Sequence, residues 1–203
     1  MARRVPREIG IKLKLPFVGE VSGNWAPEQA ERKAAWELYV ELSTRISVVP
    51  LGRDEGLARG ALTSLYTLFG STREILRKHG PATSPRKGPD EFTLGKLALT
   101  VLTVVRPVTA YWHPQLEAWE VKRATDAGPI DHENAWERID ELRAAIETVR
   151  QGLQEVAEAL AEVAGAAPLT PDSRLLGNLR KQRGGGERLK ALCHSAQRPS
   201  LAA

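Results

Sequence analysis

The stretch TLGKLALTVLTVVRPVTAYWHPQLEAWE, Thr93 to Glu120, is the most apolar part of this 203-residue chain. Its apolar residues recur at steps of three and four, which is the period of a helix with one buried side. Lys96 and Arg106 interrupt the run, so it lacks the ~20 consecutive apolar residues that a membrane-spanning helix needs. We therefore expect a core helix over about 91–122, covered by the other segments of the chain.

Two prolines lie inside this helical pattern, and each removes a backbone donor and pushes against the preceding turn. A bend or break is therefore expected near Val105 and again near Trp112. Four polar residues around these positions form a candidate site at the kink: Arg106, His113, Glu117 and Glu120. His113 and Glu117 are four apart on one helical face, but no second histidine stands at ligand spacing, so no metal site is predicted. Whether the kink forms a site or only packs stays open.

Residues 1–24 are predicted to form an N-terminal β flap. From Ile9 to Leu15 apolar residues alternate with Gly10, Lys12 and Lys14, as in a half-buried strand. Pro16 ends this strand, and residues 17–24 can return as a second short one. A lone two-stranded ribbon is marginal in water, so its apolar face must lie against the helices or pair with another chain. A packing flap and strand addition to a partner are the two interpretations.

Residues 25–164 are predicted to be helical, in four spans of about 25–49, 54–79, 91–122 and 130–164. Pro27 suits a first helical position, Asp54 suits an N-cap, and the prolines at 50 and 81 end the first two spans. Short connections force neighbouring helices to run antiparallel. The expected fold is mainly α: an antiparallel four-helix bundle with a short N-terminal β-hairpin and a basic, disordered C-terminal tail.

The last predicted helix carries a heptad seam. Its apolar residues are spaced alternately three and four apart from Ile139 to Val163. At 1.5 Å per residue this helix is ~50 Å long and outruns the others, so the end of its seam is expected to need a partner. The candidate partner-binding residues are Val149, Leu153, Val156, Leu160 and Val163. The partner is another protein, or a second copy of this chain.

The net charge of +4 is concentrated at the two ends. Residues 1–15 carry five basic side chains against one acidic, and residues 165–203 carry seven against two, so the body between them is acidic. This distribution argues against a basic patch on a folded face. Nucleic-acid binding through the basic termini is the alternative function, because basic ends attract polyanions. The segment 165–203 is expected to be mostly disordered.

Sequence signals for an enzyme are absent. There is no GxGxxG, GxxxxGK[ST], GxSxG, HExxH or CxxC pattern, and we predict neither catalytic residues nor a cofactor. The single cysteine, Cys193, excludes an internal disulfide, and the start of the chain lacks the apolar region of a secretory signal. The sequence thus predicts a cytoplasmic, non-catalytic interaction or accessory protein that is not bound to a membrane.

Three stretches, residues 12–51, 65–81 and 101–120, together resemble small helical proteins common in actinobacteria: KLKLPFVGEVSGNWAPEQAERKAAWELYVELSTRISVVPL, LYTLFGSTREILRKHGP and VLTVVRPVTAYWHPQLEAWE. The resemblance covers roughly residues 9–164. It implies an accessory component of bacterial conflict or defence loci. The shared motifs are typical of packing, so the resemblance assigns no active-site residue to this chain.

Overall fold

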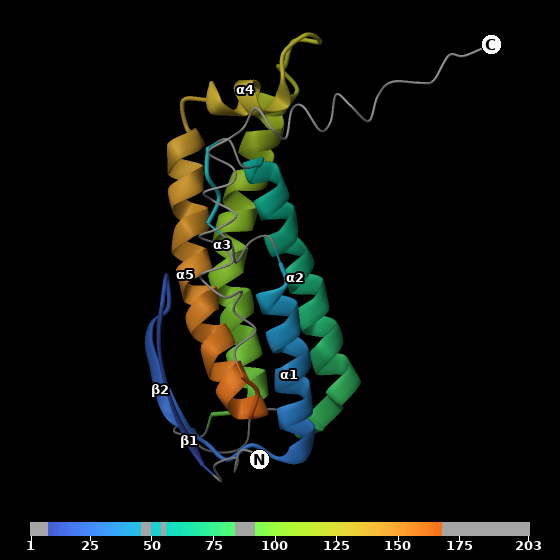
Figure 1. The fold of residues 1–203 in the computed structure, drawn as a ribbon, viewed down its shortest axis with the longest axis vertical. Coiled ribbons are helices and arrows are strands. Elements are labelled where there is room, and N and C mark those ends of the chain that lie inside the picture. Colours follow the sequence, from blue (N-terminus) through green and yellow to red (C-terminus); the bar gives the residue numbers. More distant parts are fainter. Residues whose placement is uncertain (1–7, 46–49, 54–55, 84–91, 168–203) are drawn as a thin grey trace, which may run out of the picture. The chain divides into compact units, whose positions relative to one another are not determined.

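The computed structural model describes residues 8–45, 50–53, 56–83 and 92–167. This part is mainly helical, with a two-stranded antiparallel hairpin at its N-terminal end (Figure 1). All of it belongs to one compact unit, Met1–Pro168. The second unit, Leu169–Ala203, lies outside the described residues, and with it almost all of the tail that was predicted to be basic and disordered.

The hairpin forms as its alternating pattern predicts. Strand β1 (Ile9–Leu15) pairs with β2 (Gly19–Trp25), in a register that runs from Ile9 opposite Trp25 to Leu15 opposite Gly19. The apolar side chains of β1 are all buried, and the three residues between them are all exposed. The predicted half-buried strand is therefore confirmed, and its apolar face lies against the helices, chiefly α5.

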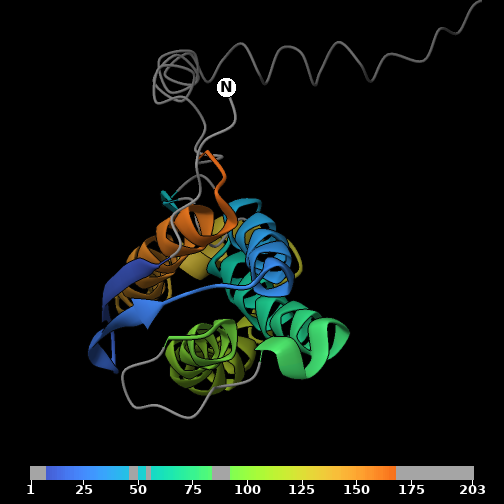
Figure 2. The same ribbon diagram turned by 90° about the horizontal axis from the view of Figure 1, so that it is seen from below.

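The helices are α1 (Gln29–Ser43), α2 (Ala58–His79), the short 3₁₀ helix η2 (Gly80–Thr83), α3 (Leu94–Glu120), α4 (Pro129–Asn134) and α5 (Ile139–Ala164). Among the four long helices, α1 contacts α5 and α2, and α3 contacts α2 and α5, as Figure 2 shows in cross-section. Arg32, near the start of α1, donates to the carbonyl of Val163, near the end of α5. These two helices therefore run antiparallel.

The first two helices are shorter than their predicted spans. Helix α1 begins after an N-cap at Glu28, so Pro27 precedes the helix and does not occupy its first position. Residues 46–49 lie outside the described part. Helix α2 begins at Ala58 behind an N-cap at Leu57, so the predicted start near Asp54, which is also outside the described part, is wrong.

Helix α3 continues unbroken through both of its prolines. Of the expected bend or break, the break is therefore wrong. Val105 and Val108, on either side of Pro107, are buried. Pro107 removes the donor to the Thr103 carbonyl, and packing on both sides of the proline holds the helix together there.

By length and composition α3 is the one helix of the described part that could cross a membrane, and half of its most apolar window is buried inside the protein. The predicted core helix is confirmed, because its apolar stripe lies in the protein core.

The last predicted helix is two helices, since residues 135–138 turn between α4 and α5. The turn places Trp136 in the core, where its ring meets that of Trp112 edge-on, with centroids 6.0 Å apart. After this break α5 has 26 residues and α3 has 27, so α5 does not outrun its neighbour.

The seam of α5 is fully covered by this chain. At most 1% of each of its five candidate residues is exposed: Val149, Leu153, Val156, Leu160 and Val163. Helix α1 and strand β1 both pack on α5. At Gly152 an added Cβ would lie 2.7 Å from the Cδ of Pro16, so the glycine lets the hairpin come close. The expectation that this seam needs a partner to bury it is therefore wrong.

Candidate functional site: the groove between α2 and α3

An open groove of about 1040 Å³ lies between α2 and α3. Tyr66 and Gly70 line it from α2, and Arg106, Ala110 and His113 line it from α3. Tyr66 is 67% exposed, which is high for a large aromatic residue on a helix. The groove therefore has an accessible, partly aromatic wall.

The structure brings together part of the predicted polar site. Arg106 and His113 both line the groove. Glu120 lies beside it and binds Arg59 of α2, whose Nε is 3.0 Å from each carboxylate oxygen. The side chain of Glu117 is exposed, and it makes no hydrogen bond or ion pair with another described residue. Sequence spacing did not indicate Arg59, because it lies 61 residues from its partner.

A contact with Arg59 positions His113 in the groove. Arg59 Nη1 lies 3.3 Å from His113 Nδ1. An arginine has only donors, so in this contact Nδ1 is the acceptor. His113 Nε2 is buried without a hydrogen-bond partner, and the ring meets Tyr66 edge-on at 5.9 Å. His113 is thus a fixed wall residue whose only acceptor atom is occupied.

His113 offers its Nδ1 atom to Arg59 and not to the groove. A general base needs a free acceptor within reach of a substrate, and this atom already accepts from Arg59. No group of three histidine, cysteine or acidic side chains in the described ranges could hold a metal ion.

Helix α3 as a whole presents little charge to solvent. Two of its nine exposed residues are charged, Arg106 and Glu117. The other seven are Leu99, Thr103, Pro107, Ala110, Tyr111, Pro114 and Ala118. On α5, by contrast, four of the eight exposed residues are acidic. Interfaces are depleted in charge at their centres and enriched in aromatic residues, so the α3 surface is the more interface-like of the two.

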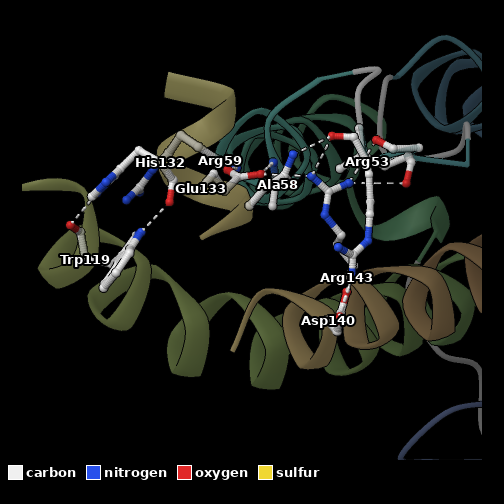
Figure 3. Close-up of polar contacts among 11 residues, drawn as sticks. Arg53, Ala58, Arg59, Trp119, His132, Glu133, Asp140 and Arg143 are labelled. Atoms are coloured by element: carbon white, nitrogen blue, oxygen red, sulfur yellow. Dashed lines mark hydrogen bonds and ion pairs between the residues drawn. The ribbon is translucent and has the colours of Figure 1, made fainter. Parts of the chain in front are cut away.

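The end of the protein at α4 is fixed by a buried polar network that sequence reasoning missed (Figure 3). Glu133, only 3% exposed, accepts from the backbone N–H of Ala58 at 2.8 Å and pairs with Arg143 at 3.1 Å. Arg143 also donates to the carbonyl of Gly52. The carboxylate thereby caps the start of α2 from a helix 75 residues away in sequence.

Next to this network α3 and α4 are joined by a reciprocal pair of hydrogen bonds. Trp119 Nε1 donates to the carbonyl of His132 at 2.9 Å, and His132 Nε2 lies 3.0 Å from the carbonyl of Trp119. The two rings stack with centroids 4.8 Å apart. Trp119 thereby holds α4 on α3.

Away from the groove, a cluster of Arg138, Tyr111, Trp112 and Glu141 joins α3 to the start of α5. The guanidinium of Arg138 lies 4.6 Å from the Trp112 ring centroid and 3.1 Å from the Tyr111 hydroxyl. This hydrogen bond lowers the pKa of Tyr111, and the bond with Glu141 raises the pKa of Arg138. The cluster fixes the first turn of α5 on α3.

No protein family, no curated protein and no solved structure matches this chain.

Proposed function

We propose that this chain is a non-catalytic interaction protein that holds an α-helix of another protein in the groove between α2 and α3. The observation that carries the proposal is the open groove between two helices with the exposed ring of Tyr66 on its wall. Exposed aromatic residues on a rigid helix are frequent anchors of binding.

A helix suits this groove because two neighbouring helices leave a channel between their ridges, and a third amphipathic helix can lay its apolar side there. Tyr66 and Phe69 supply contact area, and the small residues Gly70 and Ala110 leave room. Arg73, Glu74 and Arg106 supply charges at the same groove. The partner helix is therefore apolar on one side and carries charges of both signs at its edges.

The interaction surface proposed here replaces the seam of α5, because the seam is buried. Membership of a bacterial defence locus stays a prediction from the resemblance to actinobacterial helical proteins.

The test is site-specific photo-crosslinking in the native host. A benzophenone amino acid at Tyr66 should capture a discrete partner, whereas the same group at Gln154, which is exposed on α5, should not. The partner's crosslinked segment should be helical, and a synthetic peptide of that segment should bind the purified protein. Equal capture from both positions, or none from Tyr66, would refute the proposal.

We also propose that the four long helices make an antiparallel four-helix bundle. The contact of Arg32 with the Val163 carbonyl supports an antiparallel α1 and α5, and the pair of Arg59 with Glu120 supports an antiparallel α2 and α3. Cysteines replacing Arg59 and Glu120, in a chain with Cys193 changed to serine, should be joined by a short bifunctional thiol reagent. Cysteines replacing Arg59 and Leu99 should not be joined, because Leu99 is 21 residues, about 30 Å of helix, from Glu120. The reverse result would exclude the bundle.

A further inference from the structure

The outer edge of strand β1 has open backbone groups. In an antiparallel pair, every second residue points its N–H and C=O away from the partner strand. The N–H of Lys14 donates to Glu155 of α5 at 2.7 Å, so this residue points away from β2. Gly10 and Lys12, two and four residues earlier, face the same edge. Neither makes a backbone hydrogen bond across that edge with any described residue.

The opposite edge of the hairpin is partly covered. The carbonyl of Asn24 in β2 accepts from the backbone N–H of Phe92 at 2.8 Å. Asn24 is the register partner of Gly10, so this bond also confirms which residues of the hairpin point outward. Within the described residues each edge is therefore covered at one residue, and on the edge of β1 the backbone groups of Gly10 and Lys12 stay free.

A groove of about 540 Å³ runs along this free edge, between β1 and α5. On the α5 side it is lined by Glu155, Glu158 and Glu162. Glu158 and Glu162 are exposed and have no cationic partner among the described residues. Proteins usually protect a strand edge with charged side chains or a covering segment. Here Glu155 covers the N–H of Lys14, and Lys12, which pairs with Glu20, places a charge at the edge, but the backbone groups of Gly10 and Lys12 stay open.

We propose that β1 accepts an extended segment of a partner protein as a third strand, with basic residues at alternate positions. Its backbone pairs with the N–H and C=O groups of Gly10 and Lys12. Alternate side chains of an added strand point to opposite faces, so one set faces α5 and meets the glutamates. These side chains are arginine or lysine, and the other set lies beside Lys12 and is uncharged.

A second copy of this chain is a poorer occupant of the edge. Pairing two β1 strands about a two-fold axis would bring the two Lys12 side chains together, as well as the two rows of glutamates. Like charges directly opposite each other destabilise a sheet. The charges of the groove therefore favour a different, basic chain.

The test uses a fluorescent heptapeptide, Val-Arg-Val-Arg-Val-Arg-Val, and the full-length protein. Binding should be measurable by fluorescence anisotropy at low salt and weaken as salt rises. A peptide with glutamate in place of arginine, and one with N-methylated backbone amides, should not bind. Failure of the arginine peptide to bind, or equal binding of the N-methylated peptide, would overturn the proposal.

Protein variants separate strand addition from simple charge attraction. Lys12→Pro removes an N–H that β2 does not use, and proline is tolerated on such an edge. It should weaken binding about tenfold or more, whereas Lys12→Ala should change it less than about twofold. The double change of Glu158→Gln and Glu162→Gln should also weaken binding. If the glutamine changes weaken binding and Lys12→Pro does not, the contact is electrostatic only and the proposal fails.

Hydrogen exchange gives a readout that does not depend on a folded proline variant. The amides of Gly10 and Lys12 should exchange fast in the free protein and slowly with bound peptide. Unchanged exchange at both amides would overturn the proposal. Tyr66→Glu, in the groove between α2 and α3, should leave peptide binding intact, so failure here is distinct from failure of the proposed function.

Discussion

Glu133 is a single carboxylate on which three parts of the chain depend. It caps the start of α2, neutralises Arg143 and sits in α4, and it is almost fully buried. A buried carboxylate is costly unless each of its oxygens is satisfied. The contribution of Glu133 to stability is therefore best measured as the loss in free energy of unfolding when it is removed.

Replacing Glu133 by alanine should lower the free energy of unfolding by about 3–5 kcal/mol, because the charge of Arg143 would stay buried without its carboxylate and the N–H of Ala58 without its acceptor. Glu137→Ala is the matched control, since Glu137 is exposed and one turn away, and it should change stability by less than about 0.5 kcal/mol. Urea unfolding of both variants measures the difference. Equal stability of the two variants would show that the cap contributes nothing.

Glu37 links α1 to the end of α2, and its pKa makes this link depend on pH. Burial raises that pKa, but hydrogen bonds from Lys78 and His79 outweigh it, so the pKa lies below the ordinary value of 4.5. A lowered carboxyl pKa stabilises the fold above 4.5, and this contribution is lost as the pH falls through the folded value. Glu37→Gln should therefore flatten the fall in stability below pH 4.5, as measured by thermal unfolding across pH. An unchanged slope would contradict the assignment.

At the scale of elements, the hairpin depends on a glycine in the middle of a helix. Gly152 of α5 lets Pro16 approach to a distance that an added Cβ would violate. Gly152→Ala should destabilise the protein even though alanine favours helices by about 1 kcal/mol. Gly70→Ala in α2, where an added Cβ meets nothing within 4 Å, should stabilise it by about that amount. Thermal melting of both variants gives the sign of each effect, and a gain in both would contradict the docking of the hairpin on α5.

The elements that sequence reasoning predicted well are those whose signal is local. The alternation of Ile9 to Leu15 and the three-four spacing of α3 and α5 depend only on near neighbours, and both form as expected. The break at residues 135–138 was missed because its cause, the docking of Trp136 on Trp112, joins residues 24 apart. The two prolines predicted a bend or break in α3. The helix is continuous, because packing of the buried residues on both sides of Pro107 outweighs the lost backbone hydrogen bond.

The candidate site was predicted only in part for the same reason. Arg106 and His113 share one helical face, so their meeting at one groove follows from the spacing. Arg59, which contacts His113, comes from another helix, and a sequence pattern carries no signal for such a pair. The α5 seam was predicted correctly as an apolar stripe. The sequence pattern alone could not show that the hairpin packs on it.

At the scale of the whole molecule, two surfaces compete as the place where a partner binds, and one pair of variants decides between them. Leu153 is fully buried in the α5 seam, whereas Tyr66 is 67% exposed at the groove between α2 and α3. Leu153→Glu would place a charge in the core, so it should unfold or strongly destabilise the protein. Tyr66→Glu should leave the melting temperature within a few degrees of the wild type, because the side chain is mostly in solvent already.

Capture of the partner should then depend on Tyr66 and not on the residues of the α5 seam. We expect Tyr66→Glu to be folded and to lose the crosslinked partner, and Tyr66→Phe to keep it, because most of the contact area survives. A conservative change in the seam, Leu153→Met, should fold and bind normally, since it preserves volume. If Leu153→Glu instead remains as stable as the wild type and loses the partner, the seam is accessible in solution and the interface belongs on α5, as its heptad pattern first indicated.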